Sequence, residues 1–393
     1  MNTVYMDHLA ATPLEPRVLE AMLPFLKGRF GNPMSVHSTG QEVLASVEQA
    51  RAQVASFVNC SPREIIFTSS GSESNNTAVA GTACCPRRAG AEIIVSAVEH
   101  SSVLNTARSL SGQGIETRVI PVDKFAMVDP DDVKTAINDR TVMISIMHAN
   151  GEVGTIQPIR EIARIAREAG VPIHTDAMAA TGQIPLDVQD LGVDLMSFSA
   201  QGLFGPKGAA ALYVRKGTRM LPLLLGGVQE AGRRAGLTDV PAVVGFGEAA
   251  RIASEEQTQW SSLMSDLRDH LIKGVLERTS EVELNGHTAQ RLPGNAAFGI
   301  WYIEGESIIL SLDMEGISAS TGSSCTSRAL KTSHVLTAMG QPPELAQGSV
   351  LFTLGKGNTA GDVDHLLDTI PGIVNRLRSI SPLGRQAGTP PVR

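Results

Sequence analysis

Short apolar runs recur along the first two thirds of the chain and alternate with amphipathic segments. The runs are EIIF at Glu64, EIIVSAV at Glu92, VMISIM at Val142, VPIHTD at Val171, VDLMSFS at Val193 and AAALYV at Ala209. Between two of them, EIARIAREAG from Glu161 places apolar residues at helical spacing and ends in glycine. Continuous apolar strands separated by helices predict a mainly parallel sheet that is covered on both faces.

A second, smaller unit is expected in the C-terminal part of the chain. The segment WSSLMSDLRDHLIKGVLERT from Trp260 predicts a helix that leads into it. A chain of 393 residues is too long for one simple core, and 42% hydrophobic against 19% charged residues indicates a well-buried globular protein. The last stretch, SPLGRQAGTPPVR, is rich in proline and glycine and is expected to be loose.

Charge and cysteine content exclude several classes of protein. A net charge of -7 without long basic runs argues against nucleic acid as the main partner. We expect a cytoplasmic protein, because no signal peptide and no run long enough to span a bilayer is visible. The four cysteines, Cys60, Cys84, Cys85 and Cys325, are too few and too irregularly spaced for a disulfide framework, and no metal-binding spacing is present. Reduced thiols are therefore expected.

Several longer motifs follow one another in a fixed order. They are YMDHLAATPLEPRVLEAMLP, FGNPMSVHSTG, EIIFTSSGSESNN, MHANGEVGTIQPI, HTDAMAATGQIPLDV, STGSSCTSRALKTSHVLTAMG and GSVLFTLGKGNT. In this order the chain resembles, almost end to end, the cysteine desulfurases of NifS/IscS type within the class V aminotransferase group.

The resemblance implies a particular architecture, that of the pyridoxal phosphate (PLP)-dependent transferases of fold type I. We expect a large α/β domain over residues 13–257 with a mainly parallel seven-stranded sheet. A smaller α/β domain is expected from residues 1–12 and 258–393, and it would carry the loop of Cys325. The resemblance also implies a homodimer whose pockets lie near the subunit interface.

Four residues match family positions that hold the cofactor. In SSGSES, which follows a strand and opens a helix, Ser72 matches a phosphate ligand, although an ordinary N-capped turn would look the same. His100 matches a histidine that stacks on the pyridine ring and shuttles protons, and Asp176 matches the carboxylate that keeps the ring nitrogen protonated. Ser199 matches a further phosphate ligand. Each of these side chains has an alternative structural role in a turn or cap.

Other positions depart from the family pattern. Gln201 and Gly202 stand where the family has a histidine near the phosphate and the lysine that forms the Schiff base. Four more departures concern the ring hydroxyl, the phosphate and the substrate carboxylate: Gly151 for Asn, Ala179 for Gln, Leu237 for Thr and Leu351 for Arg.

These departures predict that PLP is not bound covalently and that stable binding is lost. A dianionic phosphate needs several donors, and each charge-assisted hydrogen bond contributes roughly 1.5 to 3 kcal/mol. Lys207 does not substitute for the missing lysine, because it belongs to the GPKG turn that the family also has. The residues around Gly202 are therefore interpreted as a vestigial cofactor site.

The sulfur-carrying motif is retained. Cys325 in STGSSCTSR matches the loop cysteine that carries a persulfide in the family, and nearby Arg328 would favour its thiolate. We expect sulfur transfer or iron–sulfur cluster assembly through Cys325 rather than PLP turnover, with Cys325 as a possible cluster ligand and a scaffold or sulfur-acceptor protein as partner.

Three other functions stay open at the level of sequence. The emptied cleft would serve a different small-molecule reaction if His100 and Asp176 act as acid and base. Alternatively, the chain is a non-catalytic regulator or partner of an active desulfurase. It would be an ordinary L-cysteine desulfurase if the missing contacts are dispensable.

Overall fold

The computed structural model describes residues 3–85, 90–322 and 332–381. Its centre is a seven-stranded sheet in the order β2-β8-β7-β6-β5-β3-β4. The strands are β2 (Ile65–Thr68), β3 (Glu92–Ser96), β4 (Glu116–Ile120), β5 (Thr141–Ser145), β6 (Ile173–Asp176), β7 (Leu195–Ser199) and β8 (Ala210–Val214). Only β8 runs antiparallel to its neighbours in this sheet. The prediction of a mainly parallel seven-stranded sheet is confirmed.

Helices cover both faces of the sheet, which explains why its strands are apolar throughout. The helices between the strands are α3 (Gly71–Ala83), α4 (Ser101–Ser109), α5 (Pro130–Ala136), α6 (Ile159–Glu168) and α7 (Val188–Leu191). Successive residues of β3 point to opposite faces: Ile93 packs in a cluster with α3 and α4, and Ile94 packs in a cluster with α6.

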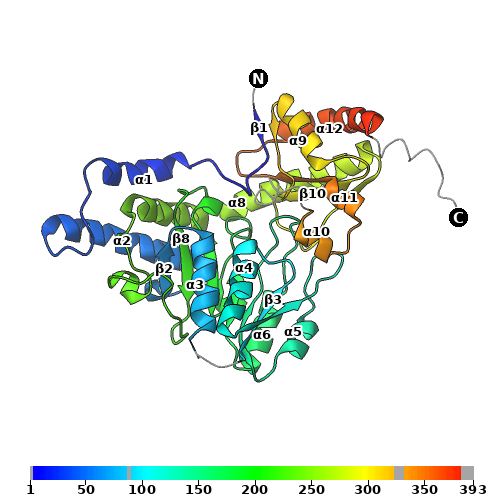
Figure 1. Cartoon of the computed structure of the whole chain (residues 1–393). Coiled ribbons are helices and arrows are strands. Elements are labelled where there is room, and N and C mark those ends of the chain that lie inside the picture. The colour runs from blue at the N-terminus through cyan, green and yellow to red at the C-terminus, as the bar shows by residue number, and fades with distance from the viewer. Residues whose placement is uncertain (1–2, 86–89, 323–331, 382–393) are drawn as a thin grey trace.

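The N-terminal helices pack on the longest helix of the chain. In Figure 1, α1 (Pro16–Lys27) and α2 (Ser38–Phe57) lie beside α8 (Val240–Arg278), which continues across the molecule toward the C-terminal elements. Asp239 caps α8 by accepting a hydrogen bond from the amide of Ala242. The helix predicted from Trp260 therefore begins about twenty residues earlier, and the expected domain boundary at Gln257 falls inside it. The division into two domains stays a prediction.

The C-terminal part forms small sheets covered by helices. A three-stranded antiparallel sheet has the order β12-β10-β9, from β9 (Val282–Leu284), β10 (Asn295–Ile300) and β12 (Ser349–Thr353). The N-terminal strand β1 (Val4–Tyr5) pairs in parallel with β11 (Ile317–Ser318), so the first residues join this part of the molecule. The associated helices are α9 (Gly305–Met314), α10 (His334–Ala338), α11 (Pro343–Gln347) and α12 (Ala360–Ile380).

Candidate active site

The residues singled out from the sequence converge at one edge of the central sheet. Asp176 is the last residue of β6 and Ser199 the last residue of β7, and Gly202 lies in the short helical turn Gln201–Leu203 that follows. Ser72 and His100 begin the helices after β2 and β3. Because all these strands run in the same direction, their carboxyl ends meet at this edge, where open α/β sheets bind ligands.

Asp176 is buried and held by two hydrogen bonds. The Asn75 amide donates to one carboxylate oxygen at 2.6 Å, and the backbone amide of Met178 donates to the other at 2.9 Å. Burial raises the pKa of Asp176, while the nearby His100 opposes this shift. The carboxyl group is therefore fixed in place but is easier to protonate than an exposed aspartate.

His100 is exposed and joined to Asp176 through a chain of hydrogen bonds. Its Nδ1 atom lies 2.7 Å from Ser102 Oγ, which accepts from Asn75 Nδ2 at 2.9 Å. The backbone amide of Ser102 also donates to His100 Nδ1 at 3.1 Å. Because Nδ1 accepts a hydrogen bond from the backbone, the neutral ring carries its proton on Nε2. His100 is therefore oriented as an Nε2–H donor. Asn75 and Ser102, which hold His100 and Asp176 in place, were not predicted from the sequence.

The loop expected to bind phosphate is largely satisfied within the protein. Ser70 caps α3 by accepting from the Glu73 amide, and the Glu73 carboxylate accepts from both the amide and the hydroxyl of Ser69, at 2.8 and 2.5 Å. Glu73 also pairs with Arg234, at 2.9 Å. Ser72 remains exposed. A carboxylate already occupies part of the helix N-terminus that an anion would use.

Gly202, where the resemblance implies the Schiff-base lysine, is tightly packed. A Cβ atom placed on Gly202 would lie 2.7 Å from the carbonyl oxygen of Thr181 and 2.9 Å from Thr181 Cβ. The preceding Gln201 is fixed from the N-terminal segment, because Thr12 Oγ1 donates to its carbonyl at 2.6 Å and its side chain donates to the carbonyl of His8 at 3.3 Å. Any side chain at position 202 requires this region to shift.

The space beside Gly151 is filled from the N-terminal segment. A Cβ atom on Gly151 would lie 2.8 Å from Leu9 Cδ1 and 3.4 Å from Ala179 Cβ. Gly151 and Ala179 are the positions where the resemblance implies amides that contact the ring hydroxyl. Leu9 thus occupies the place that an asparagine side chain at position 151 would need.

The cleft next to Gly202 is small. Its cavity of about 40 Å³ has room for about three water molecules and is far below the roughly 300 Å³ or more of typical small-molecule sites. The residues that line it include His8, Leu9, Gly151, Met178, Ala179, Thr181, Gln201, Gly202, Phe204 and Asn295. No lysine or arginine is among its lining residues in the part of the chain that the structure describes.

Two lysines lie near this cleft, and both are engaged elsewhere. Lys207 donates to the carbonyl of Thr12 at 3.0 Å. Lys356 forms an ion pair with Glu15 and lies 4.8 Å above the ring of Phe204. Neither amine lines the cavity.

The two remaining departures lie outside this cleft. Leu351 is fully buried in β12, and Leu237 is 69% exposed ahead of α8. An apolar side chain at position 351 belongs to the core of the C-terminal sheet and offers nothing to a substrate carboxylate.

Cys325 and Arg328 lie outside the described residues. Gly322, the last described residue before their segment, and Ser333, the second described residue after it, both lie at Glu152. A Cβ atom on Gly322 would be 3.6 Å from Glu152 Cβ, and the Ser333 hydroxyl donates to the Glu152 carboxylate at 2.5 Å. Glu152 follows Gly151 directly, so Gly322 and Ser333 lie close to one residue of the cleft wall.

The other three cysteines lie within the described residues. Cys60, Cys84 and Cys85 form no disulfide bond with one another and have intermediate exposure. Burial raises the pKa of Cys60 to about 12, which disfavours its thiolate. Within residues 3–85, 90–322 and 332–381, no group of His, Cys, Asp and Glu side chains is arranged to hold a metal, and no helix is long and apolar enough to cross a membrane.

The fold, with its site at the carboxyl ends of the parallel strands, is that of the PLP-dependent transferases. Comparison with known proteins shows the family. The aminotransferase class-V family matches residues 4–366. A protein named cysteine desulfurase IscS from Dictyoglomus turgidum is 48% identical over 379 residues, 96% of each chain. One named cysteine desulfurase IscS 1 from Archaeoglobus fulgidus is 47% identical over 382 residues, 97% of this chain and 100% of that protein. The solved structure of a NifS-like protein superposes with a TM-score of 0.90 at 36% identity, covering 95% of this chain and 100% of that one. The chain belongs to the cysteine desulfurase family of the class V aminotransferases.

The family depends on PLP, but the cleft of this chain does not fit the covalently bound cofactor. Asp176 and His100 have the chemistry that the ring requires. Gly202, where the resemblance implies the Schiff-base lysine, is however packed against Thr181, and Leu9 lies in the space beside Gly151, where the resemblance implies a ring-hydroxyl contact. Among the described residues that line this cleft, none has a side-chain amine that could form the Schiff base.

Proposed function

We propose that this protein is a cysteine desulfurase homologue that acts in sulfur transfer or iron–sulfur cluster assembly through Cys325, without PLP turnover of free cysteine. The observation that carries the proposal is the close packing of Gly202 against Thr181. A Schiff base needs an amine at this position, and the backbone here has no room even for a Cβ atom without a shift.

In the proposed reaction, the Cys325 thiolate attacks the outer sulfur of a persulfide on a donor protein. A new S–S bond forms on Cys325, the donor's S–S bond breaks, and the donor leaves as a thiolate. Sulfur is thus transferred with no change in total oxidation state and without a cofactor. Two described residues near that segment support this role, because Gly322 and Ser333 both lie close to Glu152, the residue that follows Gly151.

The partners in this proposal are a second copy of the chain and a sulfur-acceptor or scaffold protein, in a cytoplasmic setting. The segment between β8 and α8 supports an interface, because it carries several exposed apolar side chains. They are Leu221, Leu223, Leu224, Leu225, Val228 and Leu237. Burial of such side chains is the usual driving force of homodimer formation.

An ordinary L-cysteine desulfurase is the second candidate, and one observation favours it. Identity of 48% over 96% of the chain to a protein named cysteine desulfurase is high. Under this alternative, the protein with added PLP releases sulfide and forms alanine from cysteine. Under our proposal it does neither. Gly202→Lys alone does not reach the activity of the family, because the other five departures remain: Gly151, Ala179, Gln201, Leu237 and Leu351.

The test is sulfur transfer from an active desulfurase that has been loaded with cysteine. We expect mass spectrometry to find a persulfide on Cys325 in the wild-type protein, and none in Cys325→Ser. Cys60→Ser is the matched control and should accept sulfur normally, since the raised pKa of Cys60 keeps that thiol protonated. Transfer that survives in Cys325→Ser would rule out the proposal.

A further inference from the structure

A second and much larger cavity lies at the opposite edge of the central sheet. Its volume is about 760 Å³, within the range of small-molecule sites. Thr141, the first residue of β5, and Pro172, just before β6, lie on its wall, as do residues that follow β8. The candidate active site lies at the other ends of β6 and β7, so the two sites are separated by the length of the strands.

The lining of this cavity is strongly basic, although the whole chain carries a net charge of -7. It contains four cationic side chains, Arg167, Arg215, Lys216 and Arg219, and a single carboxylate, Asp194. Clustering of one sign of charge in a concave site raises the local concentration of ions of the opposite sign.

Two of the four cations are already used by the fold. Arg215 donates to the carbonyl of Val193 at 2.7 Å and lies 3.5 Å from Asp194. Arg167, in the last turn of α6, donates to the carbonyl of Gly192 at 3.2 Å. These contacts satisfy carbonyl groups beside the C-terminus of α6, where cations are favourable.

The other two cations have no such role. Lys216 and Arg219 are exposed, and neither side chain forms an ion pair or hydrogen bond with any residue in the described ranges. Both side chains are therefore available to a ligand that enters the cavity.

We propose that this cavity binds a small molecule carrying a phosphate or diphosphate group, held by Lys216 and Arg219. The two unpaired cations match a dianion in charge. Val142, Val171 and Pro172 give an apolar wall for the rest of the ligand. The site does not depend on the proposed function, because it shares no residue with the cleft at Gly202.

The experiment is isothermal titration calorimetry of the full chain with inorganic pyrophosphate and with ADP, at about 0.15 M salt, where exposed charges are well screened. Both probes are expected to bind. Lys216→Ala and Arg219→Ala should each weaken binding about tenfold or more.

Lys134→Ala is the matched control, because Lys134 is an exposed lysine on α5 that does not line the cavity. It should leave the affinity unchanged. The proposal is overturned if neither probe binds, or if the double variant Lys216→Ala/Arg219→Ala binds as tightly as the wild type. It is also overturned if Lys134→Ala loses as much affinity, or if polyglutamate binds through Lys216 and Arg219 while pyrophosphate does not, since the cavity would then be a surface for acidic polypeptides.

Discussion

Gly202 and Gly151 are both closely packed, so the site has no free space at either glycine for a larger side chain. At both positions a neighbouring residue lies in the space that a side chain would fill, Thr181 at Gly202 and Leu9 at Gly151. The sequence predicted which family contacts are missing. It did not predict these approaches, because Leu9 and Gly151 are far apart in the chain and meet only after the N-terminal segment packs on the cleft.

The packing at Gly202 predicts a cost for the smallest added side chain. Gly202→Ala should lower the free energy of unfolding by about 1 to 3 kcal/mol, because its Cβ would overlap the Thr181 carbonyl. Gly112→Ala is the control, since no described atom lies within 4 Å of its added Cβ, and it should change stability by less than about 0.5 kcal/mol. Urea unfolding measures both. Equal stability of the two variants would disprove the close packing.

The buried carboxyl group of Glu99 should make the stability of the protein depend on pH, and substitution of Glu99 should remove this dependence. Burial raises the pKa of Glu99 to about 8, against the hydrogen bonds from Ser96 and Met147. Between pH 4.5 and about 8 the folded protein retains a proton that the unfolded chain releases, so this group lowers stability as the pH rises. Relative to the wild type, Glu99→Gln should gain stability between pH 5 and about 8 in thermal unfolding scans. A constant difference across this range would contradict the assignment.

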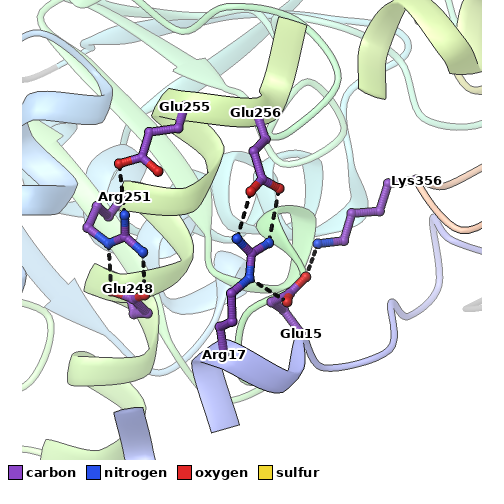
Figure 2. A network of polar contacts seen from close by, with 7 residues as sticks. All are labelled: Glu15, Arg17, Glu248, Arg251, Glu255, Glu256 and Lys356. Atoms are coloured by element: carbon purple, nitrogen blue, oxygen red, sulfur yellow. Dashed lines mark hydrogen bonds and ion pairs between the residues drawn. The ribbon is translucent and has the colours of Figure 1, made fainter. Parts of the chain in front are cut away.

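At the scale of elements, an ion-pair network joins three parts of the chain that are distant in sequence. Figure 2 shows Arg17 of α1 between Glu15 and Glu256 of α8, with Lys356, which follows β12, on the far side of Glu15. The Glu15 side chain is only 11% exposed, so these contacts are less screened than ordinary surface pairs. The network ties the N-terminal segment, whose residues fill the cleft, to both α8 and the C-terminal part.

The ion pairs of Glu15 should therefore contribute more to stability than ion pairs within a single helix. The hydrogen bond from Arg17, followed by Lys356, lowers the pKa of Glu15 to about 2. Its stabilisation is complete above pH 4.5 and is lost as the pH falls toward 2. Glu15→Gln should cost about 1 kcal/mol at neutral pH, and the difference should shrink in acid.

Arg251 supplies the control for this network. It pairs with Glu248 and Glu255, both within α8, as Figure 2 also shows. Arg251→Ala should change stability by less than about 0.5 kcal/mol. If chemical unfolding gives the same loss for Arg251→Ala and Glu15→Gln, the network has no special role in joining the elements.

Across the whole molecule, the fold was easier to predict from the sequence than the site. Runs such as EIIVSAV and VDLMSFS marked β3 and β7 to within two residues, because helices bury both faces of those strands. The edge strand β4, ETRVI, was missed because only the last of its five side chains, Ile120, is buried. The hydrogen-bond chain from Asp176 through Asn75 and Ser102 to His100 was missed because it joins residues from three elements.

The proposed homodimer predicts that exposed apolar residues before α8 hold two copies together. Leu225 is 84% exposed and Val228 is 71% exposed in a single chain. Leu225→Glu/Val228→Glu should shift the protein from dimer to monomer in analytical ultracentrifugation, because charges would be buried in the interface. Leu310→Glu, at a position on α9 that is 67% exposed, should leave the dimer intact. A dimer that withstands the double substitution would place the interface elsewhere.

Loss of the covalent cofactor is the central claim, and one measurement tests it directly. The purified chain is saturated with PLP, reduced with borohydride and weighed intact by mass spectrometry, because reduction makes any Schiff base permanent. We predict the mass of the unmodified chain, since Gly202 has no amine and both Lys207 and Lys356 are held by other groups. A stoichiometric pyridoxyl adduct on any lysine of the chain would contradict the account.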